Sequence, residues 1–286
     1  MNRQLTARPA ASPGILGDTP ERDYTRKLRL FNAFAAPELA HAIGGLGLRD
    51  GMRILDAGCG TGEVLQRLRA ASGPRARITG IDLSAAHVRA ARETVDDSIT
   101  ILQGDLLAAP LPHASFDFIW CANTLNHLHD PTAGVQRLAE LLRARGRIAI
   151  GQSSLLPELY FAWDSRLERL AREAVHRYYE DRYGLEEHDL AGARNLLGWM
   201  HGAEVHKIAA RTLVIERTAP LEPAAREYLL AGIFRDTWGE RLRPYLEPRD
   251  YDALCGLCAP DGPEFALKRR DFHFIQTFTL VVGERP

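Results

Sequence analysis

The chain has 286 residues, of which 45% are hydrophobic, and its formal net charge is −1 at pH 7. That length suits one domain with an elaborate cap, and this apolar content can bury a full core. The near-neutral charge argues against a nucleic-acid-binding protein, which carries a basic surface. The chain has no run of about 18 apolar residues, the length that a membrane-spanning helix needs, and its beginning lacks the apolar core of a signal peptide. We therefore expect a cytoplasmic protein with no membrane partner.

The beginning of the chain is rich in Ala, Pro, Arg and Gly, and residues 1–20 are expected to form a flexible tail. A helix is predicted from about residue 20, because aromatic and aliphatic residues then recur every three or four positions. These residues are Tyr24, Leu28, Phe31 and Phe34. Pro37 starts a second predicted helix, which runs to about Leu46.

A glycine-rich segment follows and organises the rest of the chain. The apolar run of Ile54 and Leu55 predicts a buried parallel strand, which ends at Asp56. Three glycines at alternate positions come next, and a helical pattern begins at Glu63. Strand, glycine turn and helix form the first βα unit of a nucleotide-binding sheet. Glycine suits the turn because a ligand must approach bare backbone there.

The acids beside the turn indicate which nucleotide binds. Asp56 and Glu63 flank the glycines, and two carboxylates would repel the pyrophosphate that a dinucleotide site holds at this helix N-terminus. They would attract a positive charge instead. The glycine spacing is also Gly-x-Gly-x-Gly, which differs from the dinucleotide pattern. S-adenosylmethionine fits, because it has a ribose, an adenine and a positive charge but no phosphate.

The next predicted strand, residues 77–82, ends at Asp82. This acid lies about 20 residues beyond the turn, where a carboxylate can accept hydrogen bonds from both ribose hydroxyls. Ser84 is then predicted to be the N-cap of a helix that runs to about Val95. The alternative for Asp82 is an acid favoured only by the dipole at the start of that helix.

Two further strands complete the pattern. Residues 99–102 form the third predicted strand, and Gly104-Asp105-Leu106 follows it. The fourth strand is Phe116-Asp117-Phe118-Ile119-Trp120-Cys121, and its carboxyl end faces the crevice in which open α/β sheets bind ligands. The loop beyond it carries three polar groups that a substrate could meet: Asn123, His127 and His129.

These four blocks, at 55–62, 80–84, 104–106 and 116–120, resemble a class I S-adenosylmethionine-dependent methyltransferase in order and spacing. The resemblance covers roughly residues 50–152. It is nearest to the ubiquinone/menaquinone-type small-molecule group. It implies an α/β fold with a doubly wound, seven-stranded, mostly parallel Rossmann-like sheet, an antiparallel last strand and helical cap insertions. It also implies S-adenosyl-L-methionine as the cofactor.

The resemblance further implies roles for individual residues. Asp105 would accept the adenine amino group, since an ionised carboxylate only accepts, and the Leu106 amide would meet a ring nitrogen. Asp105 could instead cap a turn. Tyr24 would contact the methionine end of the cofactor or the substrate, or else pack on the sheet edge. The predicted cofactor-binding residues are Tyr24, Asp56, Gly58, Gly60, Asp82, Leu83, Asp105, Leu106, Cys121 and Asn123.

We divide the chain into three parts: a tail (1–20), the N-terminal helices with the cofactor-binding core (21–152), and substrate-cap helices that also complete the sheet (153–286). The cap contains two insertions. The first, residues 155–183, is rich in aromatic side chains, which predict either an apolar pocket or packing among its own helices. A small, apolar or aromatic substrate is expected. Residues 272–282 suit an antiparallel seventh strand.

Methyl transfer is an in-line displacement, and the main task of the protein is to hold the reacting atoms collinear. An oxygen nucleophile and most carbon nucleophiles also need a base, and histidine is the best suited residue. His127 and His129 are therefore the predicted catalytic residues, unless both are surface histidines of the loop. No metal is expected. Cys255 and Cys258 have no second pair with metal spacing and are predicted to be small buried hydrophobes.

The predicted function is transfer of a methyl group to an oxygen, nitrogen or carbon atom of a small metabolite. One alternative is a related enzyme that uses the bound cofactor for a cyclisation or rearrangement. Another is a non-catalytic cofactor-binding partner subunit. The expected partner is a small-molecule substrate, with no nucleic acid, and association into a homo-oligomer is left open.

Overall fold

The structure is a computed structural model that describes residues 14–154, 164–185 and 192–286. In these ranges seven strands form one sheet, in the order β3-β2-β1-β4-β5-β7-β6. The first five strands run parallel, and β7 lies antiparallel between β5 and β6. Their bounds are β1 Arg53–Ala57, β2 Arg77–Asp82, β3 Thr100–Gln103, β4 Phe116–Ala122, β5 Leu142–Ser153, β6 His206–Thr218 and β7 His273–Glu284. The predicted fold class is confirmed.

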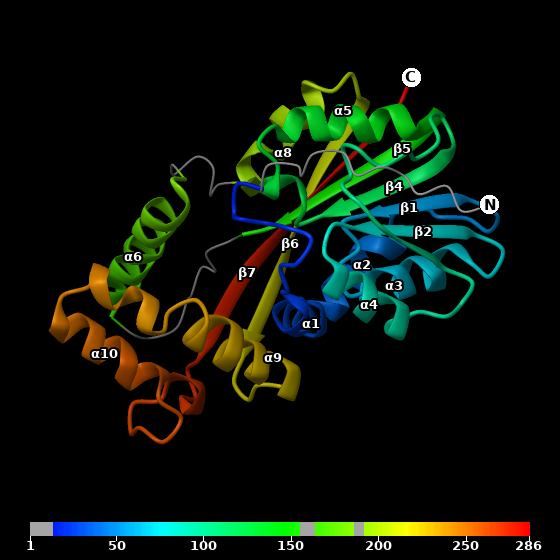
Figure 1. Cartoon of the computed structure of the whole chain (residues 1–286). Helices are drawn as coiled ribbons and strands as arrows, with labels where there is room; N and C mark the ends of the chain where they lie inside the picture. Colours follow the sequence, from blue (N-terminus) through cyan, green and yellow to red (C-terminus); the bar gives the residue numbers. More distant parts are fainter. Residues whose placement is uncertain (1–13, 155–163, 186–191) are drawn as a thin grey trace.

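Helices cover both faces of the sheet (Figure 1). Residues next to each other along a strand enter different cores, as the two-residue period of a strand requires: Ile54 and Phe118 pack on one face, Leu55 and Ile119 on the other. The first face packs against α1 (Thr25–Phe34), α2 (Ala36–Gly44), α3 (Glu63–Ser72) and α4 (Ala85–Thr94). The second packs against α5 (Pro131–Leu141) and α8 (Gly192–His201).

The cap is built from segments on either side of β6. It comprises α6 (Ser165–Tyr183), α9 (Pro223–Glu227), a π-helical continuation η2 (Tyr228–Arg235), the 3-10 helices η3 (Glu240–Tyr245) and η4 (Ala266–Lys268), and α10 (Pro248–Cys258). In Figure 1 these elements lie to one side of the sheet, beyond the end of β7. Their buried side chains join the same core as α1 and α2. The cap therefore packs continuously with the sheet.

Most predicted elements lie within a few residues of their observed bounds. The beginning of the aromatic-rich insertion, residues 155–163, lies outside the described residues. Residues 14–20 differ from the expected tail. The amide of Ile15 donates to the His127 carbonyl at 3.1 Å, and the amide of Ala85 donates to the Pro20 carbonyl at 2.8 Å. This part of the chain is tied to the sheet edge.

Gly151→Ala should lower the free energy of unfolding by about 1–3 kcal/mol. A Cβ on this β5 residue would clash with the ring of Phe278 on β7, which is fully buried and stacks on Trp120. Urea denaturation measures the effect. Gly198→Ala is the matched control, because Gly198 lies at an exposed position of α8 and its added Cβ would meet nothing within 4 Å. This variant should be more stable by roughly 0.5–1 kcal/mol. Equal midpoints for the two variants would contradict the packing described for β5 and β7.

Candidate functional site

The carboxyl ends of three neighbouring strands meet at the glycine turn. Asp56 on β1 lies in register with Gly80 on β2 and Trp120 on β4. The turn is tied to the end of β2, because the amides of Gly58 and Cys59 both donate to the Ile81 carbonyl, at 2.8 and 2.9 Å. The residues after β1, β2 and β4 are thereby brought to one place, as the sequence predicts.

Two glycines of the turn leave no room for side chains. Gly58 has φ +81°, and an added Cβ would clash with Thr124 in the loop after β4. Gly60 has φ +52°, and its added Cβ would lie 3.1 Å from Leu28 of α1. Both backbone angles disfavour other residues. The turn is therefore held between the loop after β4 and the first helix, with bare backbone at its surface.

Asp82 is the centre of a hydrogen-bond network at the end of β2. Its Oδ2 accepts from the Gly60 amide at 2.8 Å, and its Oδ1 accepts from the Ser84 amide at 3.0 Å and from His87 Nδ1 at 3.1 Å. A carboxylate has about four acceptor positions, so about one remains for a ligand. The predicted contact with two ribose hydroxyls would require one of these donors to move. Ser84 is the N-cap of α4, as predicted.

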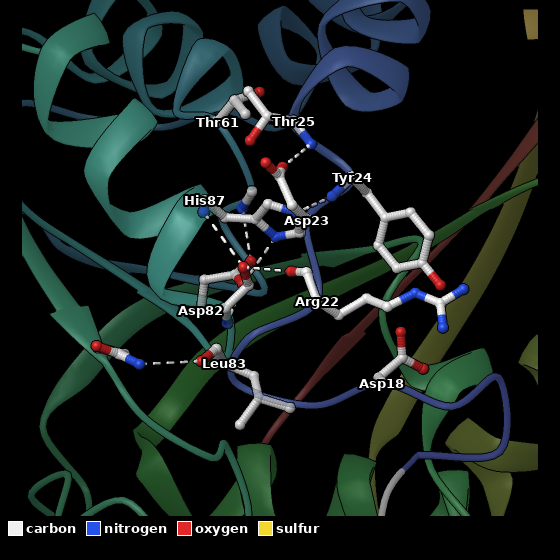
Figure 2. A network of polar contacts seen from close by, with 12 residues as sticks. Asp18, Arg22, Asp23, Tyr24, Thr25, Thr61, Asp82, Leu83 and His87 are labelled. Carbon is white, nitrogen blue, oxygen red and sulfur yellow. Dashed lines mark hydrogen bonds and ion pairs between the residues drawn. The ribbon is translucent and has the colours of Figure 1, made fainter.

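His87 links this network to the segment before α1 (Figure 2). The Tyr24 amide donates to His87 Nε2 at 3.0 Å. Because Nε2 accepts, the proton of the neutral ring lies on Nδ1, which donates to Asp82. His87 was not among the predicted site residues. Its position in the first turn of the helix that follows Asp82 was the available signal.

Asp56 is buried, with 2% of its surface exposed, and its Oδ2 has no hydrogen-bond partner. Desolvation and the nearby Asp82 raise the pKa of this carboxyl to about 8. A buried oxygen without a partner is costly in a folded protein. It indicates that a donor from outside the chain completes this position.

Glu63 has a different role from the one expected. Its Oε2 accepts from Thr61 Oγ1 at 2.6 Å and from Asn32 Nδ2 at 3.0 Å, and Arg29 lies 3.9 Å from Oε1. Asn32 and Arg29 belong to α1. The carboxylate therefore holds the first helix over the glycine turn, and Asp56 is the acid whose oxygen is left without a donor.

Asp105 shows the turn-capping contact that was its alternative. Its Oδ1 accepts from the Leu107 amide at 2.9 Å, and its backbone carbonyl accepts from Ala109 at 2.7 Å. Leu106 is buried in the second core, and the neighbouring Leu83 carbonyl accepts from Gln103 at 3.4 Å. The adenine role of Asp105 and Leu106 stays a prediction.

The loop after β4 is anchored on β5. Asn123 has φ +51°, its amide donates to the Gly151 carbonyl at 2.8 Å, and its Oδ1 accepts from the Ser153 amide at 2.8 Å. Cys121 is fully buried, and burial raises the pKa of its thiol. Both residues lie at the predicted place, but the Asn123 side-chain oxygen is used to hold the loop.

His127 ends the short helix η1 (Leu125–His127) in that loop, and its Nδ1 lies 2.8 Å from Asp18 Oδ2. His129 is exposed two residues later, next to Asp130, which is the N-cap of α5.

Tyr24 is partly buried, and desolvation raises the pKa of its hydroxyl to about 12. The Arg22 guanidinium lies 4.9 Å from the Tyr24 ring centroid. The Tyr24 backbone amide is linked to Asp82 through His87.

The other candidate groups are the cysteines and the aromatic side chains of the cap. In the described residues no three His, Cys, Asp or Glu side chains could hold a metal ion. Cys255 on α10 is exposed and Cys258 is partly buried, so the prediction that both are buried is wrong for Cys255. A cavity of about 790 Å³ lies in the cap, between the start of α6 and α10. On α6 the ring of Tyr179 contacts those of Tyr178 and Tyr183. Tyr178 also contacts Tyr245 of η3, and the Tyr183 hydroxyl accepts from Arg22 at 3.4 Å.

No helix of the described ranges is both long enough and apolar enough to cross a membrane.

The buried carboxyl predicts a pH-dependent stability. Between about pH 4 and about pH 8 the folded state keeps the Asp56 proton that the unfolded state has lost, because the folded pKa is the higher one. The stabilisation is complete below about pH 4 and is lost as the pH rises to about 8. Relative to Asp56→Asn, the wild type should lose up to about 1.4 kcal/mol per pH unit in this window.

Urea midpoints measured at about pH 5 and about pH 7.5, without cofactor, test this prediction. Parallel profiles for the wild type and Asp56→Asn would mean that Asp56 is ionised in the folded state.

Known proteins resemble the same part of the chain. The family model described as "Methyltransferase domain" matches residues 54–146. The 27-O-demethylrifamycin SV methyltransferase of Amycolatopsis mediterranei is 38% identical over 119 residues, which cover 40% of this chain and 43% of that protein. The demethylmenaquinone methyltransferase of Shouchella clausii is 27% identical over 150 residues, which cover 49% of this chain and 64% of that protein. The matched region spans less than two thirds of either relative.

Among solved structures, the [4+2]-cyclase SpnF has a TM-score of 0.50 and 19% identity, and the match covers 97% of this chain and 88% of that one. At this identity the likeness shows the fold alone. The family match over residues 54–146 includes the glycine turn and the acids at the ends of β1 and β2. Over residues 54–146 the chain is therefore similar to the methyltransferase domain of class I S-adenosylmethionine-dependent methyltransferases.

Proposed function

We propose that this chain is an enzyme that transfers the methyl group of S-adenosyl-L-methionine to a small, apolar or aromatic molecule. The observation that carries the proposal is the buried Asp56 oxygen without a partner, which lies at the glycine turn beside Asp82. A ligand that brings a positive charge and hydrogen-bond donors would complete it. Gly58 and Gly60 present backbone without side chains at this turn.

The predicted residues fit this cofactor by their chemistry. Asp56 would give up its proton when the cofactor binds and hold the positively charged end as a carboxylate, and Asp82 would accept from the ribose through its remaining acceptor position. Asp105 has one oxygen, Oδ2, to which no described residue donates, and it suits an adenine amino group. The sulfonium supplies an activated methyl group with a good leaving group. The residues of the chain bind and orient the reactants, which is a proximity effect.

The acceptor is proposed to be a small molecule because of the cap and the relatives. The cap packs beside the carboxyl edge and supplies tyrosines from α6. By name, one relative methylates a rifamycin precursor and another methylates demethylmenaquinone. His127 and His129, in the loop after β4, are the proposed residues for proton transfer from the acceptor.

Two other functions have some support. The fold of a [4+2]-cyclase resembles this one, so the cofactor could assist a cyclisation or rearrangement without methyl transfer. A partner subunit that binds cofactor without catalysis is the other. The hydrogen bond that orients His127 favours an enzyme. Product analysis separates the three functions, because only methylation yields S-adenosylhomocysteine at the rate of product formation.

Calorimetric titration should show micromolar binding of S-adenosylmethionine and S-adenosylhomocysteine, and no binding of NAD, because the Gly-x-Gly-x-Gly spacing of the turn differs from the dinucleotide pattern. The protein is first freed of co-purified ligand. Binding of NAD alone would contradict the proposal.

Asp82→Ala should weaken binding of S-adenosylhomocysteine at least tenfold. The variant loses a charge-assisted contact worth roughly 1.5–3 kcal/mol and the anchor of the Gly60 amide. The same titration measures it. Asp97→Ala, an exposed acid after α4, is the control and should bind as the wild type does. Unchanged affinity in Asp82→Ala would exclude Asp82 from the cofactor site.

A further inference from the structure

Residues 14–24, which we call the strap, cross the carboxyl edge of the sheet before α1 begins. At one end, the Ile15 amide donates to the His127 carbonyl, beyond β4. At the other, the Tyr24 amide donates to His87 and the Ser84 hydroxyl donates to the Arg22 carbonyl at 2.6 Å, both beyond β2. The strap therefore spans the glycine turn and joins the predicted cofactor side of the site to its predicted substrate side.

Asp18, a carboxylate of the strap, contacts His127. Asp18 Oδ2 lies 2.8 Å from His127 Nδ1, and the two side chains are 16% and 31% exposed. A carboxylate only accepts hydrogen bonds, so the proton of the neutral imidazole must lie on Nδ1. His127 Nε2 is then left with an acceptor lone pair, and no described residue donates to it.

The contact is preorganised by the fold of the strap. The Gly14 amide donates to the Asp18 carbonyl at 3.1 Å, which closes a tight loop around the carboxylate. A Cβ on Gly14 would lie 2.7 Å from the His127 carbonyl and 2.9 Å from Asp18 Oδ2, so only glycine allows this approach. In Figure 2 Asp18 lies on the strap near Arg22 and Tyr24.

His87 provides an internal comparison. Both of its ring nitrogens are used, one by Asp82 and one by the Tyr24 amide, so it cannot take a proton from a substrate without losing a partner. His127 has one ring nitrogen bound to a carboxylate and the other available. Of the two histidines, only His127 has the arrangement that a general base requires.

We propose that Asp18 is the positioning residue that makes His127 the general base, and that this base acts on a hydroxyl group, one of the acceptors that must lose a proton. This inference rests on the proposed methyltransferase function. His127 Nε2 takes the proton of the hydroxyl while the oxygen lone pair forms the bond to the methyl carbon. The carbon–sulfur bond breaks and its electron pair stays on sulfur. Asp18 stabilises the imidazolium that results.

A spectroscopic test needs neither cofactor nor substrate. In cofactor-free protein labelled with 15N-histidine, the ring shifts of neutral His127, assigned with His127→Gln, should report the Nδ1–H tautomer. Asp18→Ala should convert it to a mixture with Nε2–H. Glu21→Ala is the matched control, because it removes an exposed carboxylate of the strap that has no described partner, and its spectrum should equal that of the wild type.

Neutral wild-type His127 in the Nε2–H form would overturn the proposal before any variant is made, so it stays testable even if Asp18→Ala does not fold. An unchanged tautomer in folded Asp18→Ala would overturn it too.

Turnover with phenols and aliphatic alcohols tests the acceptor. Asp18→Ala and His127→Ala should each lower kcat about 10²- to 10⁴-fold, and the double variant should be no slower than the slower single one. Affinity for S-adenosylhomocysteine should stay within about twofold of the wild type. Methylation confined to amines or carbon, or full activity of Asp18→Ala, would overturn the proposal. A protein that does not bind the sulfur cofactors would instead refute the proposed function and leave the tautomer result unchanged.

Discussion

The site depends on one constraint, the anchoring of the glycine turn on the carboxylate that ends β2. The Gly60 amide donates to Asp82, and the amides of Gly58 and Cys59 donate to the Ile81 carbonyl. These bonds hold backbone of positive φ, which few residues adopt, against a neighbouring strand. Because Asp82 also accepts from His87, the same carboxylate orients the histidine that binds the strap. A change at Asp82 would therefore affect the turn, α4 and the strap together.

The two acids at the strand ends differ in burial and in hydrogen bonding. Asp82 is surrounded by donors, whereas Asp56 lies in the core with an oxygen that has no partner and a pKa raised to about 8. The buried Asp56 Oδ2 thus lacks a hydrogen bond at the proposed cofactor site. Cofactor binding would satisfy it, so we expect binding and stability to be linked.

The strap gives the two halves of the site a common element. It binds His87 on the side of β2 and His127 on the side of β4. The fold itself does not decide the chemistry, since a cyclase shares it. Under the proposal, the difference lies in a few placed groups: an orphaned acid, a carboxylate–histidine pair and the side chains of the cap.

The sequence by itself determined the order of the elements, the glycine turn, the strand-end acids and the N-cap at Ser84, because these depend on hydrophobic period and on residues near in the chain. It could not reveal that Asp18 meets His127 across 109 positions, that Glu63 is bound by α1, or that His87 bridges Asp82 to Tyr24. It also misjudged residues 14–20 as a flexible tail, since nothing local distinguishes a tail from a strap. Contacts between distant segments arise only when the sheet brings its strand ends together, and the tertiary structure alone decided them.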